Sequence, residues 1–277
     1  TQSLERTIAE QTAAIERDPK NASAYEKRGG AWLAAGNLDK ALTDLEQSIE
    51  LEPERTSAYI NRAGIHVLSE QSVPSLADRN TPIRLSQDSS RAYFNRGLIY
   101  RKSGQWDAAI EDLSKALTLD RELKPASEIL VQLLIDRGKE LHRNGKFKEA
   151  IYDYSAALAL SPSNAVAQSN RGVCWYSAGD VAKGLADLEL AIKTDPTYTS
   201  AYLNRGGIYL AEGDAEKSLI DFERAVQLAP NDARGYFNRS LAWKKLGDQA
   251  RASRDYRTAV ELDPRFAKVK QQLQENE

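Results

Sequence analysis

The sequence predicts an all-α protein built from repeated pairs of helices. A five-residue motif, Ala58-Tyr59-Ile60-Asn61-Arg62, returns 34 residues later at 92–96, and two further copies at 201–205 and 235–239 have the same separation. Small residues return at fixed places in each period, and proline recurs near its end. Periods of about 20 to 50 residues are typical of stacked helical repeats, in which each unit packs only on its neighbours.

Seven full repeats follow from this spacing, and we number the positions in each from 1 to 34. Repeats one to three span residues 22–123, and repeats four to seven span 131–266. The extra segment 124–130 lies between them. The repeats start at Ala22, Thr56, Ser90, Val131, Ala165, Thr199 and Ala233.

The recurring columns predict where the helices pack and end. Positions 8 and 20 are small in every repeat, which allows two helix backbones to approach closely. Position 15 is glycine in six repeats, where the first helix should end in a tight turn. Position 11 is usually aromatic, and proline at position 32 should stop the second helix. These prolines are Pro53, Pro162, Pro196, Pro230 and Pro264.

Together these columns resemble the tetratricopeptide repeat family. The resemblance covers nearly the whole chain and implies a right-handed superhelical solenoid of antiparallel helix pairs, whose first helices line a concave groove. The pentatricopeptide family, which binds RNA, is the nearest alternative. Its repeats are longer by one residue and its members are strongly basic, and neither feature is present here.

Four segments depart from the regular repeat. Residues 1–21 read as the second helix of a partial repeat, and residues 267–277 as a polar capping helix. In the 124–130 insertion, Pro125 favours an early start of the next helix, and a loop is the alternative. In the second repeat, Arg79 and Pro82 predict that the second helix ends near 79–81, either as a tolerated irregularity or as a partner site.

Composition argues against several functional classes. The net charge of −2 supplies no basic field for nucleic acid or anionic membrane, and no stretch is apolar enough to predict a membrane span. Cys174 is the only cysteine, so an internal disulfide and a thiolate-rich metal site are not expected. We find no phosphate loop, catalytic carboxylate pair or cofactor motif. A reducing cytosol fits the chain, and we expect no enzyme activity of its own.

Position 6 is the first candidate for a binding role. It is asparagine in five repeats, and an Asn side chain offers both a donor and an acceptor to a peptide backbone. The repeat region of O-linked N-acetylglucosamine transferases uses a similar ladder. Alternatively, asparagine is simply a common residue at this position of the family. The five residues are Asn61, Asn95, Asn170, Asn204 and Asn238.

By the same resemblance, positions 2, 5, 9, 12 and 13 also face the groove. The basic residues there are Arg91, Arg101, Lys102, Lys139, Arg143, Arg234, Lys244 and Lys245, and the apolar residues at position 5 include Phe94, Phe237, Ile60, Ile135 and Leu203. They are either a solvated face or a surface for an extended partner with acidic and apolar side chains. The lysine that carboxylate-clamp repeats need at position 5 is absent.

Position 7 is arginine and position 23 is aspartate in all seven repeats. This co-recurrence predicts a structural ion pair between a first and a second helix. Whether the pair forms within a repeat or across a boundary is left open.

We therefore predict a protein-interaction scaffold that binds an extended peptide in its groove. Two alternatives remain at this point. The array is the substrate-recruiting region of a larger enzyme such as a glycosyltransferase, or it is a self-associating assembly factor that forms homo-oligomers.

Overall fold

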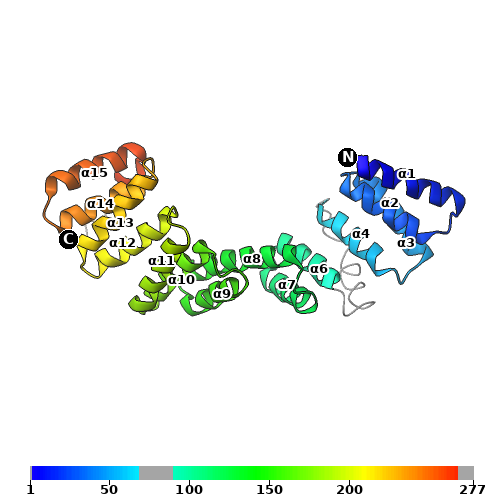
Figure 1. Cartoon of the computed structure of the whole chain (residues 1–277), viewed down its shortest axis with the longest axis horizontal. Helices are drawn as coiled ribbons and strands as arrows, with labels where there is room; N and C mark the ends of the chain where they lie inside the picture. The colour runs from blue at the N-terminus through cyan, green and yellow to red at the C-terminus, as the bar shows by residue number, and fades with distance from the viewer. Residues whose placement is uncertain (1, 69–89, 268–277) are drawn as a thin grey trace. The chain divides into compact units, whose positions relative to one another are not determined.

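The computed structural model describes residues 2–68 and 90–267, and every regular element in these ranges is an α-helix, as the sequence predicts (Figure 1). Helix α1 (Gln2–Arg17) comes first. The first helices of the repeats are α2 (Ala22–Ala34), α4 (Thr56–Leu68), α6 (Ser90–Lys102), α8 (Lys124–Arg143), α10 (Ala165–Ser177), α12 (Thr199–Ala211) and α14 (Ala233–Lys245). The described second helices are α3 (Leu38–Leu51), α7 (Trp106–Leu119), α9 (Phe147–Leu160), α11 (Val181–Thr194), α13 (Ala215–Leu228) and α15 (Gln249–Leu262).

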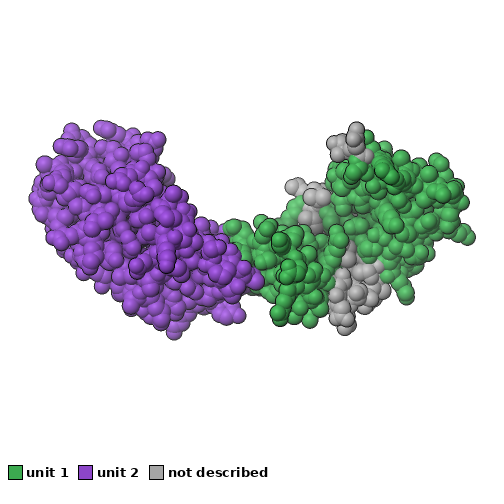
Figure 2. All heavy atoms as spheres, in the orientation of Figure 1, with its two compact units in different colours: residues 1–133 green, residues 134–277 purple. Residues whose placement is uncertain are grey.

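The chain folds into two compact units, residues 1–133 and 134–277 (Figure 2). In the first unit each helix packs on the next, from α1 to α4, and α4 then packs on α6 and α6 on α7. In the second unit the same chain of contacts runs from α9 to α15. First helices also touch one another there, α10 with α12 and α12 with α14, so they form a continuous row.

The inserted segment 124–130 is helical. It forms the first two turns of α8, which has 20 residues where the other first helices have 13. Pro125 lies in the first turn, where a missing backbone N–H costs no intrahelical hydrogen bond. The segment is therefore an early start of the helix and not a loop.

Glycine ends the first helices, as predicted. The glycines at position 15 have positive φ angles between 72° and 91°, a backbone conformation that a residue with a Cβ adopts only at a steric cost. They are Gly36, Gly104, Gly145, Gly179, Gly213 and Gly247. The second helix of each of these pairs begins two residues after the glycine.

The small residues at positions 8 and 20 allow the close approach that the sequence predicts. A Cβ on Gly172 of α10 would lie 2.8 Å from the carbonyl oxygen of Gly184 on α11, and a Cβ on Gly184 would lie 2.9 Å from the carbonyl oxygen of Gly172. The two backbones are therefore in direct contact. In the next repeat a large side chain takes up the space, and Phe222 lies 2.7 Å from where a Cβ of Gly206 would be.

The Arg–Asp pairs form within each described repeat. In six repeats the arginine Nε and Nη2 donate to the two carboxylate oxygens of the aspartate 16 residues later, at 2.6–2.9 Å. All six aspartates are buried, while the arginine side chains are 20–23% exposed. The hydrogen bond to Asp221 raises the pKa of Arg205. The pairs are Arg28–Asp44, Arg96–Asp112, Arg137–Asp153, Arg171–Asp187, Arg205–Asp221 and Arg239–Asp255.

A second periodic contact covers the aromatic residue at position 11. A cation at position 19 of the second helix lies over the ring: Lys183 over Trp175 at 4.5 Å and Arg251 over Trp243 at 4.2 Å. Both cations also pair with the carboxylate that caps their helix. In these two repeats the cap, the cation and the ring thus tie the start of the second helix to the first helix.

Two expectations lie outside the described residues. The short second helix predicted for the second repeat falls in 69–89. The capping helix predicted for 267–277 falls, apart from its first residue, in 268–277.

We predict that Asp187→Ala destabilises the protein by about 3 kcal/mol, because it leaves the guanidinium of Arg171 without its buried partner. Urea unfolding measures the loss, and hydrogen exchange should show that it concentrates in α10 and α11, since repeats interact mainly with neighbours. The control is Glu140→Ala, which breaks an exposed pair with Arg143 and should cost less than about 1 kcal/mol. Equal losses for the two variants would contradict a structural role of the buried pair.

A second prediction compares two helical glycines. Gly172→Ala should lower the melting temperature, because the clash with the Gly184 carbonyl costs about 1–3 kcal/mol and exceeds the helix-propensity gain of about 1 kcal/mol. Gly207→Ala in α12 should raise it, since a Cβ there meets no atom within 4 Å. Shifts of the same sign in both variants would show that close approach does not decide the outcome.

Candidate functional site

The candidate binding residues divide between the two units. Asn61, Arg91, Phe94, Asn95, Arg101 and Lys102 lie on α4 and α6 in the first unit, and Arg143, Asn170, Asn204, Arg234, Phe237, Asn238 and Lys244 lie on α8, α10, α12 and α14 in the second. We call the side of α10, α12 and α14 that carries positions 2, 6, 9, 12 and 13 the first-helix face of the second unit.

The asparagines at position 6 are half-buried, and two of them have their amide nitrogens close to the preceding first helix. Asn204 Nδ2 donates to Ser169 Oγ on α10 at 3.1 Å. Asn61 Nδ2 in the first unit lies 3.7 Å from the place of a Cβ on Gly30 of α2. Asn170 Nδ2 is buried and has no hydrogen-bond partner. On the preceding first helix, α8, the residue equivalent to Ser169 is Ile135, whose side chain offers no hydrogen-bond acceptor.

Position 5 does not project from the face as expected. Ile135, Leu203 and Phe237 are buried, and the ring of Phe237 stacks on Phe266 with centroids 4.7 Å apart. The prediction that position 5 faces the groove is therefore wrong for Phe237. Its burial follows from the contact between α14 and the segment after α15. Phe94 in the first unit is half-buried.

Several basic residues of the second unit are already neutralised. Arg143 pairs with Glu140 at 2.6 Å, and Lys139 with Asp136 at 3.2 Å. Arg234 forms a two-pronged contact with Asp232, the carboxylate that caps α14. Lys244 and Lys245 are exposed in the last turn of α14. On α6 in the first unit, Arg91, Arg101 and Lys102 are all exposed.

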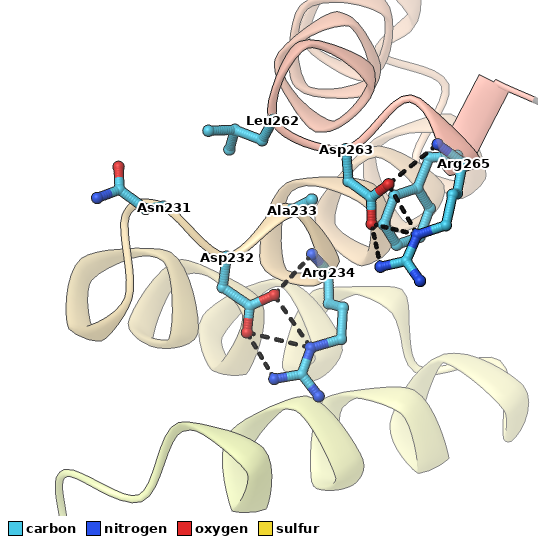
Figure 3. A pocket seen from close by; sticks show the side chains of 8 residues that line it. Asn231, Asp232, Ala233, Arg234, Leu262, Asp263 and Arg265 are labelled. Atoms are coloured by element: carbon cyan, nitrogen blue, oxygen red, sulfur yellow. Dashed lines mark hydrogen bonds and ion pairs between the residues drawn. The ribbon is translucent and has the colours of Figure 1, made fainter.

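Arg234 also borders a hollow of about 820 Å³ between the N-terminal end of α14 and the C-terminal end of α15 (Figure 3). Figure 3 shows two Asp–Arg ion pairs on its wall, Asp232 with Arg234 and Asp263 with Arg265. In each pair the arginine donates hydrogen bonds to the aspartate two residues before it. The pKa values of both aspartates are lowered, mainly by the hydrogen bonds from these arginines. Because each charge is matched locally, the hollow offers no net charge to a ligand.

The middle of the first-helix face is uncharged. Arg171 and Arg205 are the only charged residues of α10 and α12, and both are bound to buried aspartates. The remaining face residues are neutral: Val166, Asn170, Val173, Tyr176 and Ser177 on α10, and Ser200, Asn204, Gly207, Leu210 and Ala211 on α12. Apart from the asparagines, the candidates predicted from the sequence were basic or position-5 residues, so this neutral stretch was not predicted.

The described part of the chain offers little for catalysis or metal binding. It contains no group of three His, Cys, Asp or Glu side chains that could hold a metal ion. Cys174 is fully buried, and burial raises the pKa of its thiol to about 12, so it is a packing residue. Burial lowers the pKa of His142. Among the described helices, none is long and apolar enough to cross a membrane.

Comparison with known proteins agrees with the repeat architecture. Tetratricopeptide repeat families match residues 8–66, 90–123, 199–232 and 233–266, and a further TPR repeat family matches 138–179. Helix pairs of this kind, joined by glycine turns and packed on their neighbours, define the class of helical solenoid repeat proteins. The chain belongs to the tetratricopeptide repeat family.

Individual relatives match more loosely. The inactive TPR repeat-containing thioredoxin TTL3 of Arabidopsis thaliana is 32% identical over 81 residues, which are 27% of this chain and 12% of that protein. The crystal structure of MamA superposes with a TM-score of 0.52 at 24% identity, covering 66% of this chain and 96% of MamA. The Naa15/Naa10 complex with HypK-THB gives a TM-score of 0.59 at 17% identity, covering 88% of this chain and 37% of that one. The two structures show the fold alone.

The different surroundings of two ladder residues give a third prediction. Asn170→Ala removes a buried donor without a partner, whereas Asn204→Ala breaks a hydrogen bond to the buried Ser169. Both changes have the same helix-propensity gain, so Asn204→Ala should be the less stable variant by about 1–3 kcal/mol. Urea unfolding of the two variants without ligand measures the difference. Equal stabilities would contradict this assignment of the amide contacts.

Proposed function

We propose that this chain is a non-catalytic interaction scaffold that binds an extended peptide segment on the first-helix face of the second unit. The observation that carries the proposal is the row of half-buried asparagines, Asn170, Asn204 and Asn238, at the same position of three consecutive first helices that touch one another. Neighbouring first helices lie about 10 Å apart, and an extended peptide advances about 3.3 Å per residue, so each asparagine would meet every third peptide unit.

The orientation of the side chains supports a specific chemistry. The amide nitrogens of Asn170 and Asn204 are turned into the helix interface, so the carbonyl oxygens are the atoms left for a ligand. Such oxygens accept hydrogen bonds from peptide N–H groups, which every residue except proline offers. Recognition of this kind reads the backbone and depends little on the side chains of the partner.

The test is a selection of random 12-residue peptides displayed on phage, followed by titration of the selected synthetic peptides. Replacing Asn170, Asn204 and Asn238 together by Ala should weaken all of them to a similar extent. Each lost hydrogen bond is worth about 0.5–1.5 kcal/mol, so the triple variant should lose at least about tenfold in affinity. Fluorescence anisotropy measures it.

A matched triple variant controls for nonspecific damage. Gln227→Ala, Arg257→Ala and Glu261→Ala change three exposed residues of the second helices α13 and α15 and should leave the affinities unchanged. If the asparagine variant binds every peptide as tightly as the parent protein, the ladder does not bind peptide backbone.

A further inference from the structure

Helix α6 in the first unit carries only positive charge. Its 13 residues include Arg91, Arg96, Arg101 and Lys102 and no acidic residue. Arg96 is bound to the buried Asp112 of α7 at 2.6 Å. The other three cations are exposed, and in the described part of the chain none of them forms a hydrogen bond or an ion pair. The outer side of α6 therefore has three positive charges that no described residue balances.

Four residues of α6 form one stripe along its outer side. Arg91, Asn95, Leu98 and Lys102 follow one another at intervals of four, three and four residues, so they lie on the same side of the helix. Asn95 and Leu98 are half-buried between the two exposed cations, and Arg101 borders the stripe at its C-terminal end. We call these four residues the α6 stripe. It has a positive charge at each end and a polar and an apolar side chain between them.

The neighbouring first helices add no unmatched negative charge. Helix α6 packs on α4, and α4 packs on α2 (Figure 1). Helix α4 has no acidic residue. On α2 the one acidic residue, Glu26, is bound to Arg55 at 3.0 Å, whereas Lys27 is exposed. The first helices of this unit are thus positive on their outer side, in contrast to the neutral α10 and α12 of the second unit.

These charges define what a partner gains on the stripe. Acidic side chains that reach Arg91 and Lys102 are attracted, and basic ones are repelled. Over Leu98 an ion would lose hydration without gaining a partner, which costs free energy. The stripe therefore favours a ligand that is acidic, then apolar, then acidic again.

A peptide fits this pattern better than a nucleic acid strand. Single-stranded nucleic acids carry a charge on every nucleotide and are bound by continuous basic grooves with aromatic side chains on which the bases stack. Here Leu98 separates the cations at the two ends, and the aromatic residue beside the stripe, Phe94, is half-buried. On α4 the only arginine or lysine is Arg62, which lies over the ring of Tyr59.

The amide of Asn95 favours an extended segment over a helical one. In the described part of the chain its side chain has no hydrogen-bond partner, so it offers both a donor and an acceptor. An extended peptide presents backbone N–H and C=O groups to such an amide, whereas a helix uses its own internally. The stripe from Arg91 to Lys102 is about 16 Å long, which corresponds to about five residues of extended peptide.

We propose that the α6 stripe binds an extended acidic segment of another protein, in which one apolar side chain contacts Leu98 and the acidic residues on either side of it reach Arg91 and Lys102. This is a second binding surface, in the first unit. It does not depend on the peptide site proposed for the second unit.

The probe is a rhodamine-labelled synthetic peptide of 12 residues with blocked ends, made of Ser with one Leu, a Glu three positions before it and a Glu two positions after it. A second version has the reverse order, so that both chain directions are represented. Three matched peptides replace both Glu residues by Gln, both Glu residues by Lys, or the Leu by Ser. Anisotropy titrations with the full chain at low and high salt measure the affinity of each peptide.

The Glu peptide should bind the parent protein at least about tenfold more tightly than the Gln and Lys peptides, and high salt should remove most of this difference. The Leu-to-Ser peptide should bind at least about threefold more weakly than the Glu peptide, because it loses the apolar contact with Leu98. Equal affinities of the Glu, Gln and Lys peptides would overturn the proposal.

Charge reversal locates the site on the protein. Arg91→Glu with Lys102→Glu changes two exposed, unpaired residues, so the variant should fold, which its thermal melt verifies. It should bind the Glu peptide at least about tenfold more weakly than the parent does, and the Lys peptide more tightly. The control is Lys115→Glu with Arg121→Glu, which changes the net charge equally at two exposed positions on and just after α7 and should retain the preference for Glu.

The remaining outcomes separate this proposal from the function proposed for the second unit. If Arg91→Glu with Lys102→Glu loses no more affinity than the control, the α6 stripe does not bind the segment. If the triple asparagine variant loses the Glu peptide instead, the acidic segment binds the second unit, so the scaffold function stands and this proposal is wrong. A labelled 12-nucleotide oligothymidylate that binds the parent more tightly than the Glu peptide, and that the charge reversal releases, would make the stripe a nucleic acid surface and overturn the proposal.

Discussion

The buried Arg–Asp pair is the interaction on which each repeat depends. Its two parallel hydrogen bonds join a first helix to its own second helix, and in two repeats the same arginine also reaches the preceding second helix, as Arg171 does through Ser155 Oγ at 3.2 Å. A buried ion pair is not necessarily better than an apolar contact of the same volume. Once one partner is present, however, removal of the other leaves a buried charge, so the two positions remain coupled in every described repeat.

The same pair determines the character of the exposed surface. Because Arg171 and Arg205 are bound to carboxylates in the core, α10 and α12 present only neutral side chains on their outer side. The electrostatics of the face then depend on its two ends. A structural interaction in the interior thus sets the chemistry that is available to a ligand.

Close packing between repeats limits which residues a partner can reach. Position 5 is buried in all four repeats of the second unit because it lies against the neighbouring first helix, and Phe237 is covered further by Phe266. Position 6 is only half-buried. The amide nitrogen of Asn204 donates to Ser169 between the two helices, and the amide oxygen is the atom that binds a ligand in the proposed function. The amide nitrogen of Asn170 is also buried, but it has no hydrogen-bond partner. Local costs of this kind are expected at functional sites.

Sequence periodicity by itself determined the helix pairs, the turns and the two columns, arginine and aspartate, that form the ion pair. Each of these features depends on residues within about 16 positions of one another in the chain, and the same residue pattern recurs in the seven repeats. Glycine at position 15 and the co-recurrence of Arg28 with Asp44 are examples, since both result from local geometry within one repeat. The sequence also pointed to the asparagine column, because the same residue type returns at the same helical position.

Only the tertiary structure decided which atoms of those columns remain accessible. That the Arg–Asp pair closes within a repeat, that Phe237 is buried and that Arg234 is bound to Asp232 depend on contacts between helices, which a list of positions does not contain. Gly206 and Gly207 illustrate the limit most clearly. They are adjacent and chemically identical, yet one touches Phe222 and the other borders open space. The difference arises because successive residues of a helix point about 100° apart, so only the arrangement of neighbouring helices determines what each one meets.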